Sequence, residues 1–162
     1  MSRSIPGAAG KLLTHPAGWI ATGFGSGLAP VAPGTFGTAA ALLPWLAMRD
    51  LPLGYYALAV CVAFTLGTWA CQWTIRRLGV EDPGLVVWDE FVGVWIALFA
   101  VPTGWYWALA AFVLFRFFDI AKPWPVNWAD RKIEGGLGTM LDDAFAGVYA
   151  LVCVQVLYRV FA

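Results

Sequence analysis

The sequence predicts an all-α fold, a polytopic integral membrane bundle with about five short membrane-associated helices, built as a single domain over residues 1–162. Three observations favour this class. The chain is 60% hydrophobic and only 12% charged, and its mean hydropathy of +0.72 lies outside the range of soluble domains. Apolar runs recur along the chain between short segments rich in Gly, Pro and charge. No polar stretch is long enough for a second domain or a flexible linker.

The expected helices follow the apolar runs in chain order, at residues 36–48, 54–75, 86–101, 105–118 and 140–161. A helix needs about 20 apolar residues to cross the hydrocarbon core of a bilayer. The shorter runs therefore indicate tilted helices, local thinning of the membrane or partial insertion. Pro102, Thr103 and Gly104 form a turn signal inside a long apolar stretch, which predicts two short helices in a hairpin instead of one continuous helix.

The charged residues are distributed unevenly between the two sides of the expected membrane. The formal net charge is zero, so no overall field attracts a nucleic acid and none is expected as a partner. If the N-terminus is cytoplasmic, most basic residues face the cytoplasm, which is the usual bias of membrane proteins. These residues are Arg3, Lys11, Arg76, Arg77, Arg116, Lys122, Arg131 and Lys132, against Arg49 and Arg159 on the far side. Nine of the ten acidic residues fall on the same cytoplasmic side, where we expect the active site.

The first expected helix follows a loop, GFGSGLAPVAPGTFGT at residues 23–38, that is rich in Gly and Pro. Backbone amides and hydroxyls around Thr35 and Thr38 can hold an anion, because the first N–H groups of a helix have no partner within it. A Gly-Thr pair before a helix is more often a simple N-terminal cap. Taken alone, this segment favours the cap.

Two pairs of adjacent carboxylates stand near the start of two expected helices. Asp89 and Glu90 begin the third apolar segment, and Asp142 and Asp143 begin the fifth. A single acidic residue there would be explained by the helix dipole. Neighbouring residues point about 100° apart on a helix, so one member of each pair is expected to face the bundle or lipid, where an unpaired carboxylate is costly. A divalent cation held by all four would resolve the cost, and oxygen ligands indicate Mg²⁺ or Mn²⁺.

A basic segment, FRFFDIAKPWPVNWADRKIEGGLG at residues 115–138, connects these helices. It carries four cations, Arg116, Lys122, Arg131 and Lys132. They are either a patch attracted to anionic lipid heads or a clamp for a phosphoryl group whose other oxygens meet the metal. Asp119 lies three residues from Arg116 and from Lys122, so it is either a salt-bridge partner or a further metal ligand.

Carboxylates for a metal, cations for a phosphate and a place at headgroup depth together indicate metal-assisted chemistry on a phosphorylated lipid. Other phosphatase mechanisms lack their residues. Cys71 and Arg77 have the spacing of cysteine phosphatases, but no glycine-rich loop lies between them. His15 is the single histidine, which excludes a histidine nucleophile with a second histidine as acid.

Four blocks of the sequence resemble the signatures of the phosphatidylglycerophosphatase A family, in order and at similar spacing. They are PVAPGTFGT (30–38), VVWDEFVGVW (86–95), FRFFDIAKPWPVNW (115–128) and GGLGTMLDDAFAGVYA (135–150). Several ordered blocks are more specific than one short motif. The resemblance implies a Mg²⁺-dependent phosphatase of the bacterial inner membrane that converts phosphatidylglycerophosphate to phosphatidylglycerol and inorganic phosphate, in phosphatidylglycerol and cardiolipin biosynthesis.

The residues and the resemblance together define one expected site, with Mg²⁺ as cofactor, the lipid phosphate as substrate and the bilayer as partner. The expected metal ligands are Asp89, Glu90, Asp142 and Asp143. The expected catalytic residues, for Mg²⁺-assisted attack of water on phosphorus, are Asp89, Glu90, Asp119 and Asp143. The expected phosphate-binding residues are Thr35, Thr38, Arg116, Lys122 and Arg131.

Two functions of other classes fit parts of the same pattern. Carboxylates at the ends of apolar helices also mark cation pathways, so a small ion carrier or channel component is the alternative. The position of the carboxylates on one membrane face, and not at the midplane, disfavours it. A transferase that uses a nucleotide-activated lipid is disfavoured because the Asp-Gly-x-x-Ala-Arg run associated with such enzymes is absent from the sequence.

Overall fold

The computed structural model describes residues 10, 12–81 and 83–161. Every regular element in this part of the chain is helical, which confirms the all-α prediction. The elements are α2 (Pro16–Ala21), the 3₁₀ helix η1 (Ser26–Leu28), α3 (Pro33–Met48), α4 (Leu53–Leu78), α5 (Trp88–Ala97), α6 (Trp105–Ala121), α7 (Val126–Lys132) and α8 (Gly135–Phe161). Each expected apolar run overlaps one of α3, α4, α5, α6 and α8, whereas the short helices α2 and α7 are additional. Residues Arg3 and Lys11, used in the charge bias, lie outside the described residues.

Among the described residues, two helices are long and apolar enough to cross a membrane, which is fewer than the five membrane helices expected. They are α4, with 26 residues, and α8, with 27 residues, and they contain 18-residue stretches with a mean hydropathy of 1.5 and 1.7. At a rise of 1.5 Å per residue each is about 40 Å long. The helices α3, α5 and α6 have 16, 10 and 17 residues. The five-helix membrane bundle is therefore not confirmed, and two candidate spans remain.

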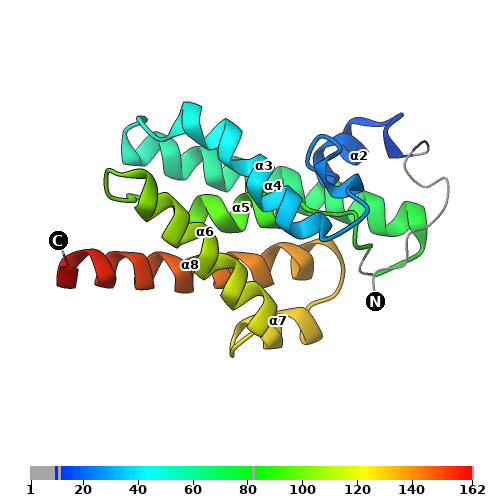
Figure 1. Ribbon diagram of the computed structural model, residues 1–162. Coiled ribbons are helices and arrows are strands. Elements are labelled where there is room, and N and C mark those ends of the chain that lie inside the picture. Colours follow the sequence, from blue (N-terminus) through cyan, green and yellow to red (C-terminus); the bar gives the residue numbers. More distant parts are fainter. Residues whose placement is uncertain (1–9, 11, 82, 162) are drawn as a thin grey trace.

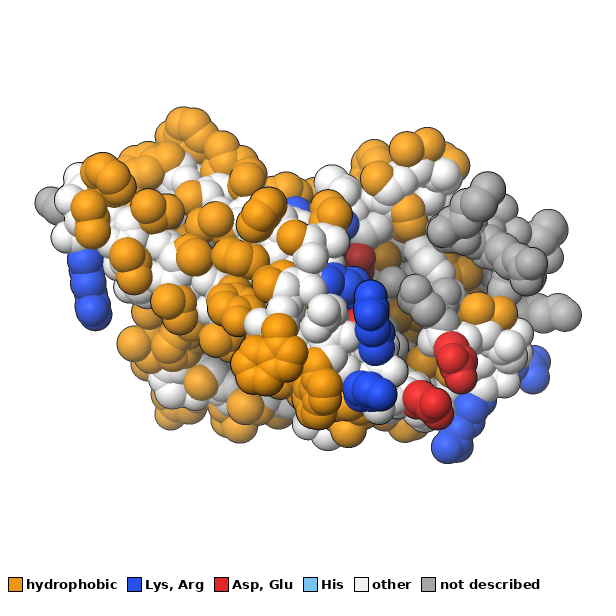
Figure 2. Space-filling model, turned by 90° about the horizontal axis from the view of Figure 1, so that it is seen from below, with side chains coloured by type: hydrophobic (Ala, Val, Ile, Leu, Met, Phe, Trp, Pro, Cys, Tyr) orange, Lys and Arg blue, Asp and Glu red, His pale blue; other side chains and the backbone are white. Residues whose placement is uncertain are grey.

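Apolar stripes face outward on the long helices. On α4 the exposed residues Tyr55, Leu58, Val62, Leu66 and Trp69 recur every three or four positions, so they form one face of the helix. Valines spaced four apart form a similar stripe on α8, from Val148 to Val160. Figure 2 shows hydrophobic side chains covering most of one face of the molecule, with charged side chains gathered mainly toward one end. Continuous exposed apolar faces of this extent indicate membrane association.

Helix α8 packs against α4, α5, α6 and α7. In Figure 1 the C-terminal end of α8, the α3–α4 turn and the α5–α6 turn lie at one end of the molecule, and the start of α8 lies toward the other. The backbones of α5 and α8 meet at two glycines: a Cβ atom built on Gly147 would lie 2.3 Å from the carbonyl oxygen of Gly93. This close approach brings Asp143, one turn before Gly147, next to α5.

The short helix α5 is buried and tied to its neighbours by side-chain hydrogen bonds. The indole Nε1 of Trp88 donates to the carbonyl oxygen of Ala63 on α4 at 3.0 Å. The indole Nε1 of Trp95 donates to the carbonyl oxygen of Ala41 on α3 at 2.8 Å. Because both ends of α5 are fixed in this way, its first turn is held at a defined place in the bundle.

Candidate active site

A cavity of about 410 Å³ opens at the start of α8. Its walls come from the α4–α5 loop, the first turn of α5, the end of α6, α7 and the first turns of α8. The lining includes the acidic residues Glu81, Asp89, Glu90, Asp119, Asp130, Glu134, Asp142 and Asp143, and the basic residues Lys122 and Arg131. Among the described residues, eight acidic and two basic side chains line this cavity, which gives a formal charge of −6. Such an excess repels any anionic substrate unless cations enter with it.

Three of the predicted carboxylates converge within this cavity. Asp89, Glu90 and Asp143 each place a carboxylate oxygen within 4.8 Å of the other two. Oε2 of Glu90 and Oδ2 of Asp143 are buried and have no hydrogen-bond partner in the structure. A buried ionised oxygen without a partner carries a large desolvation cost. The group is therefore incomplete by itself and suited to a cation.

The chemistry of this group selects the kind of cation. Its donors are carboxylate oxygens, and no histidine or cysteine belongs to it. Oxygen-only donors suit hard ions such as Mg²⁺, Mn²⁺ and Ca²⁺, whereas zinc sites favour nitrogen and sulfur. The residues thus fit the predicted Mg²⁺.

The fourth predicted ligand, Asp142, has a different partner. Its Oδ2 accepts a hydrogen bond from Nζ of Lys122, and Lys122 also donates to Oδ1 of Asp130 at 3.0 Å. Burial lowers the pKa of Lys122, but the charge and hydrogen bond of Asp142, together with Asp130, outweigh burial and raise that pKa above its ordinary value. The other oxygen of Asp142, Oδ1, is buried without a partner. Asp142 thus lines the same cavity without joining the close group of three.

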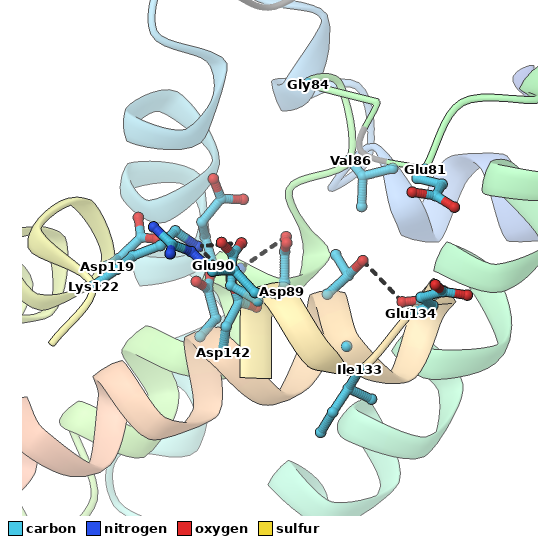
Figure 3. Close-up of a pocket in the computed structure, with 16 residues that line it drawn as sticks. Glu81, Gly84, Val86, Asp89, Glu90, Asp119, Lys122, Ile133, Glu134 and Asp142 are labelled. Atoms are coloured by element: carbon cyan, nitrogen blue, oxygen red, sulfur yellow. Dashed lines mark hydrogen bonds and ion pairs between the residues drawn. The ribbon is translucent and has the colours of Figure 1, made fainter. Parts of the chain in front are cut away.

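Arg116 and Asp119 form an ion pair beside the group. Nη1 of Arg116 lies 2.7 Å from Oδ2 of Asp119 and 3.6 Å from Oε1 of Glu90. Asp119 lines the cavity and Arg116 does not. The structure therefore places this predicted phosphate-binding arginine behind the carboxylates. Figure 3 shows Asp119, Lys122, Glu90, Asp89 and Asp142 gathered at one end of the cavity, with Glu81 and Glu134 at the other.

The remaining predicted phosphate-binding residues differ in position. Arg131 is exposed and lines the cavity. Thr38 is fully buried, and its hydroxyl donates to the carbonyl oxygen of Gly34 at 2.8 Å. Thr35 is exposed, and neither threonine lines the cavity. Their hydroxyls are not brought to the cavity.

Sequence reasoning did not single out several cavity residues. Glu81 and Glu134 are two of the nine acidic residues expected on the cytoplasmic side, and both line the cavity. Thr139 lines it as well. Thr139 lies three and four residues before the two aspartates of α8, a spacing that places it on their face of the helix. This spacing is the feature of the sequence that could have identified Thr139 as a cavity residue.

The fold and the cavity define a helical protein with two candidate membrane spans, a strongly acidic cavity and a three-carboxylate group. Comparison with known proteins gives the family. The family model of phosphatidylglycerophosphatase A matches residues 19–158, and the chain belongs to this family.

Curated relatives agree over most of the chain. The phosphatidylglycerophosphatase A of Escherichia coli (strain K12) is 47% identical over 137 residues, which are 84% of this chain and 80% of that protein. The phosphatidylglycerophosphatase A of Haemophilus influenzae is 46% identical over 144 residues, 88% of each chain. A protein of Bacteroides thetaiotaomicron, named as a candidate phosphatidylinositol-3-phosphatase, is 48% identical over 149 residues, 85% of this chain and 90% of that protein. No solved structure shows a significant match.

Proposed function

We propose that this chain is a Mg²⁺-dependent lipid phosphatase of the bacterial inner membrane, which hydrolyses phosphatidylglycerophosphate to phosphatidylglycerol and inorganic phosphate. The family and the two relatives of that name support the phosphatase activity and the substrate. They give no support to the ion carrier. The observation that carries the mechanism is the convergence of Asp89, Glu90 and Asp143 in an acidic cavity.

Electrostatics supports a divalent cation as part of the active form. A phosphate monoester carries up to two negative charges near neutral pH, and the cavity that would receive it has a formal charge of −6. Asp89, Glu90 and Asp143 would hold the ion through their carboxylate oxygens. When bound, Mg²⁺ polarises the phosphoryl oxygens and offsets the charge that develops on them during hydrolysis.

Lys122 and Arg131 are the two cations of the cavity that can contact the phosphate. The ammonium group of lysine has three N–H donors, and Asp142 and Asp130 accept two of them. One donor of Lys122 therefore remains for a phosphate oxygen. Asp142 holds Lys122 in place, while Arg131, at the exposed rim, adds charge-assisted hydrogen bonds.

The reaction is a single displacement at phosphorus. The oxygen of a water molecule forms a bond to phosphorus while the bond from phosphorus to the glycerol oxygen breaks. A carboxylate of the cavity accepts a proton from the water, and the glycerol oxygen takes up a proton as it leaves. The products are phosphatidylglycerol and inorganic phosphate, and the enzyme returns to its starting state.

The length of α8 supports a site at headgroup depth. From Asp142 to Phe161 the helix rises about 30 Å, the thickness of the hydrocarbon core of a bilayer. The two aspartates therefore fall where the hydrocarbon region ends. The excess of basic residues on that side of the chain supports an orientation with the cavity facing the cytoplasm.

A panel of lipid phosphates tests the proposal. Purified protein in detergent or proteoliposomes is incubated with phosphatidylglycerophosphate, phosphatidic acid, lysophosphatidic acid and phosphatidylinositol 3-phosphate, each with Mg²⁺ or with EDTA. We expect release of inorganic phosphate from phosphatidylglycerophosphate in Mg²⁺ and none in EDTA. No release from this lipid under any condition would overturn the proposal, and faster release from phosphatidylinositol 3-phosphate would reassign the substrate.

A further inference from the structure

We infer that Gly34 and Arg116 are positioning residues, which fix the carboxylate of Glu90 in the three-carboxylate group from outside the cavity. The inference rests on the proposed function, because it concerns how that group is held ready for a divalent cation. Neither residue lines the cavity. They come from different helices, α3 and α6, and both meet Glu90 at the same oxygen, Oε1.

Arg116 provides the charge that holds Glu90. Its side chain is only 16% exposed, and Nη1 lies 3.6 Å from Oε1 of Glu90 and 2.7 Å from Oδ2 of Asp119. One guanidinium group thus links a carboxylate of the group of three to a second carboxylate of the cavity. Because the arginine does not line the cavity whereas both acids do, it holds these acids from the side away from the cavity.

Gly34, near the start of α3, provides the space that Glu90 occupies. A Cβ atom at this position would lie 2.2 Å from Oε1 of Glu90 and 3.2 Å from both Nη atoms of Arg116. Its backbone has no positive φ that would require glycine, so alanine is otherwise the better residue in a helix. The glycine is therefore needed for the position of the Glu90 carboxylate and not for the backbone of α3.

A Cβ atom added at Gly34 should change the carboxylate group without destabilising the fold. The atom that a Cβ at Gly34 would displace is the far end of a flexible side chain. Glu90 can rotate away at little cost to the folded state. Its oxygen then leaves the position within 4.8 Å of Asp89 and Asp143, and the group loses a ligand.

The test compares Gly34→Ala with Gly54→Ala, a matched control because a Cβ at Gly54 meets nothing within 4 Å. Binding of Mn²⁺ is measured by electron paramagnetic resonance on purified protein, beside the thermal unfolding midpoint and the kcat and KM for phosphatidylglycerophosphate. For Gly34→Ala we expect the Kd for Mn²⁺ to rise about tenfold or more, as for other residues that orient metal ligands. The unfolding midpoint of metal-free protein and the KM at saturating metal stay near wild type.

A second pair of variants tests the arginine. Arg116→Gln should weaken Mn²⁺ binding about as much as Gly34→Ala, and Arg116→Lys should restore part of the affinity because it keeps a cation near Oε1 of Glu90. Combining Gly34→Ala with Arg116→Gln should cost less than the sum of the single effects, since both act through one carboxylate.

Each outcome bears on one claim. The positioning role is contradicted if Gly34→Ala binds Mn²⁺ with wild-type affinity, or if Gly54→Ala loses as much affinity as Gly34→Ala. It is also contradicted if Gly34→Ala unfolds, because the displaced carboxylate can move at small cost. A change in KM for the lipid at saturating metal, with Mn²⁺ affinity unchanged, would mean that Arg116 binds substrate instead. Failure of the proposed function looks different: the wild-type protein itself would bind no Mn²⁺ and release no phosphate.

Discussion

The close approach of α5 and α8 makes Gly147→Ala a direct test of how the site is assembled. A Cβ at Gly147 would lie 2.3 Å from the carbonyl oxygen of Gly93 and 3.0 Å from Cβ of Ile96. An ordinary contact of this kind lies at 3.4 Å or more, so the two helices must separate by about 1 Å. Here the obstacle is backbone, which cannot rotate away. Overpacking of this kind costs about 1 to 3 kcal/mol.

The separation acts on stability and on catalysis together. For a chain of this size, each kcal/mol lowers the unfolding midpoint by about 2 to 4 °C, so we expect a fall of about 2 to 12 °C. Asp143 precedes Gly147 by one turn of α8 and would move away from Asp89 and Glu90. A displacement of about 1 Å at a reacting site can cost about a hundredfold in rate, so phosphate release should fall by one to two orders of magnitude.

The assay measures thermal unfolding in detergent and release of inorganic phosphate from phosphatidylglycerophosphate. Val148→Ala is the matched control, because this neighbouring side chain is 48% exposed on the outer face of α8. The control should retain activity. If Gly147→Ala kept both its unfolding midpoint and its rate, the packing of α5 on α8 would not hold the carboxylates in register, and the reasoning would be wrong.

Three further predictions concern the cavity. Asp143→Asn should lower phosphate release more than a hundredfold even at saturating Mg²⁺. If the variant instead released phosphate at a near-normal rate at limiting Mg²⁺, Asp143 would not be a metal ligand. Lys122→Gln leaves the buried carboxylate of Asp142 unpaired, so it should destabilise the protein by a few kcal/mol, and adding Asp142→Asn should recover part of that loss in thermal unfolding. The raised pKa of Lys122 means that its stabilising charge is fully present below about pH 10.5 and is lost only as the pH rises above that value. Loss of the Lys122 proton should therefore produce no basic limb in the wild-type rate profile between pH 6 and 9, and a basic limb there that Lys122→Gln abolishes would contradict this.

The apolar runs were enough to predict where the long helices lie, because a helix of this kind is a run of apolar residues bounded by Gly and Pro. They were not enough to count membrane spans. Helix α5 reads as strongly apolar, but it has only ten residues and is enclosed by its neighbours. Burial within protein and burial within lipid favour the same residues, so composition does not separate them.

The acidic pairs were predicted as one site, and the structure brings three of the four carboxylates together. The angle between adjacent helical residues explains the division on α8: Asp143 turns toward α5, whereas Asp142 turns toward Lys122. Which of the two aspartates faces α5 depends on the rotation of α8 about its axis, and glycine contacts with α4 and α5 set that rotation. The position of Arg116 depends on how α6 packs beside α5, where its guanidinium group meets Glu90, so spacing alone did not reveal it.

The order of the helices along the chain has a consequence for biosynthesis. Asp89 and Glu90 belong to α5, and Asp143 belongs to α8, which begins only at Gly135. A nascent chain that ends before α8 holds two of the three carboxylates and lacks the wall of the cavity that α8 provides. Asp143 can therefore join Asp89 and Glu90 only after α8 has been synthesised and has packed against α5, so a chain truncated before α8 would lack the three-carboxylate group.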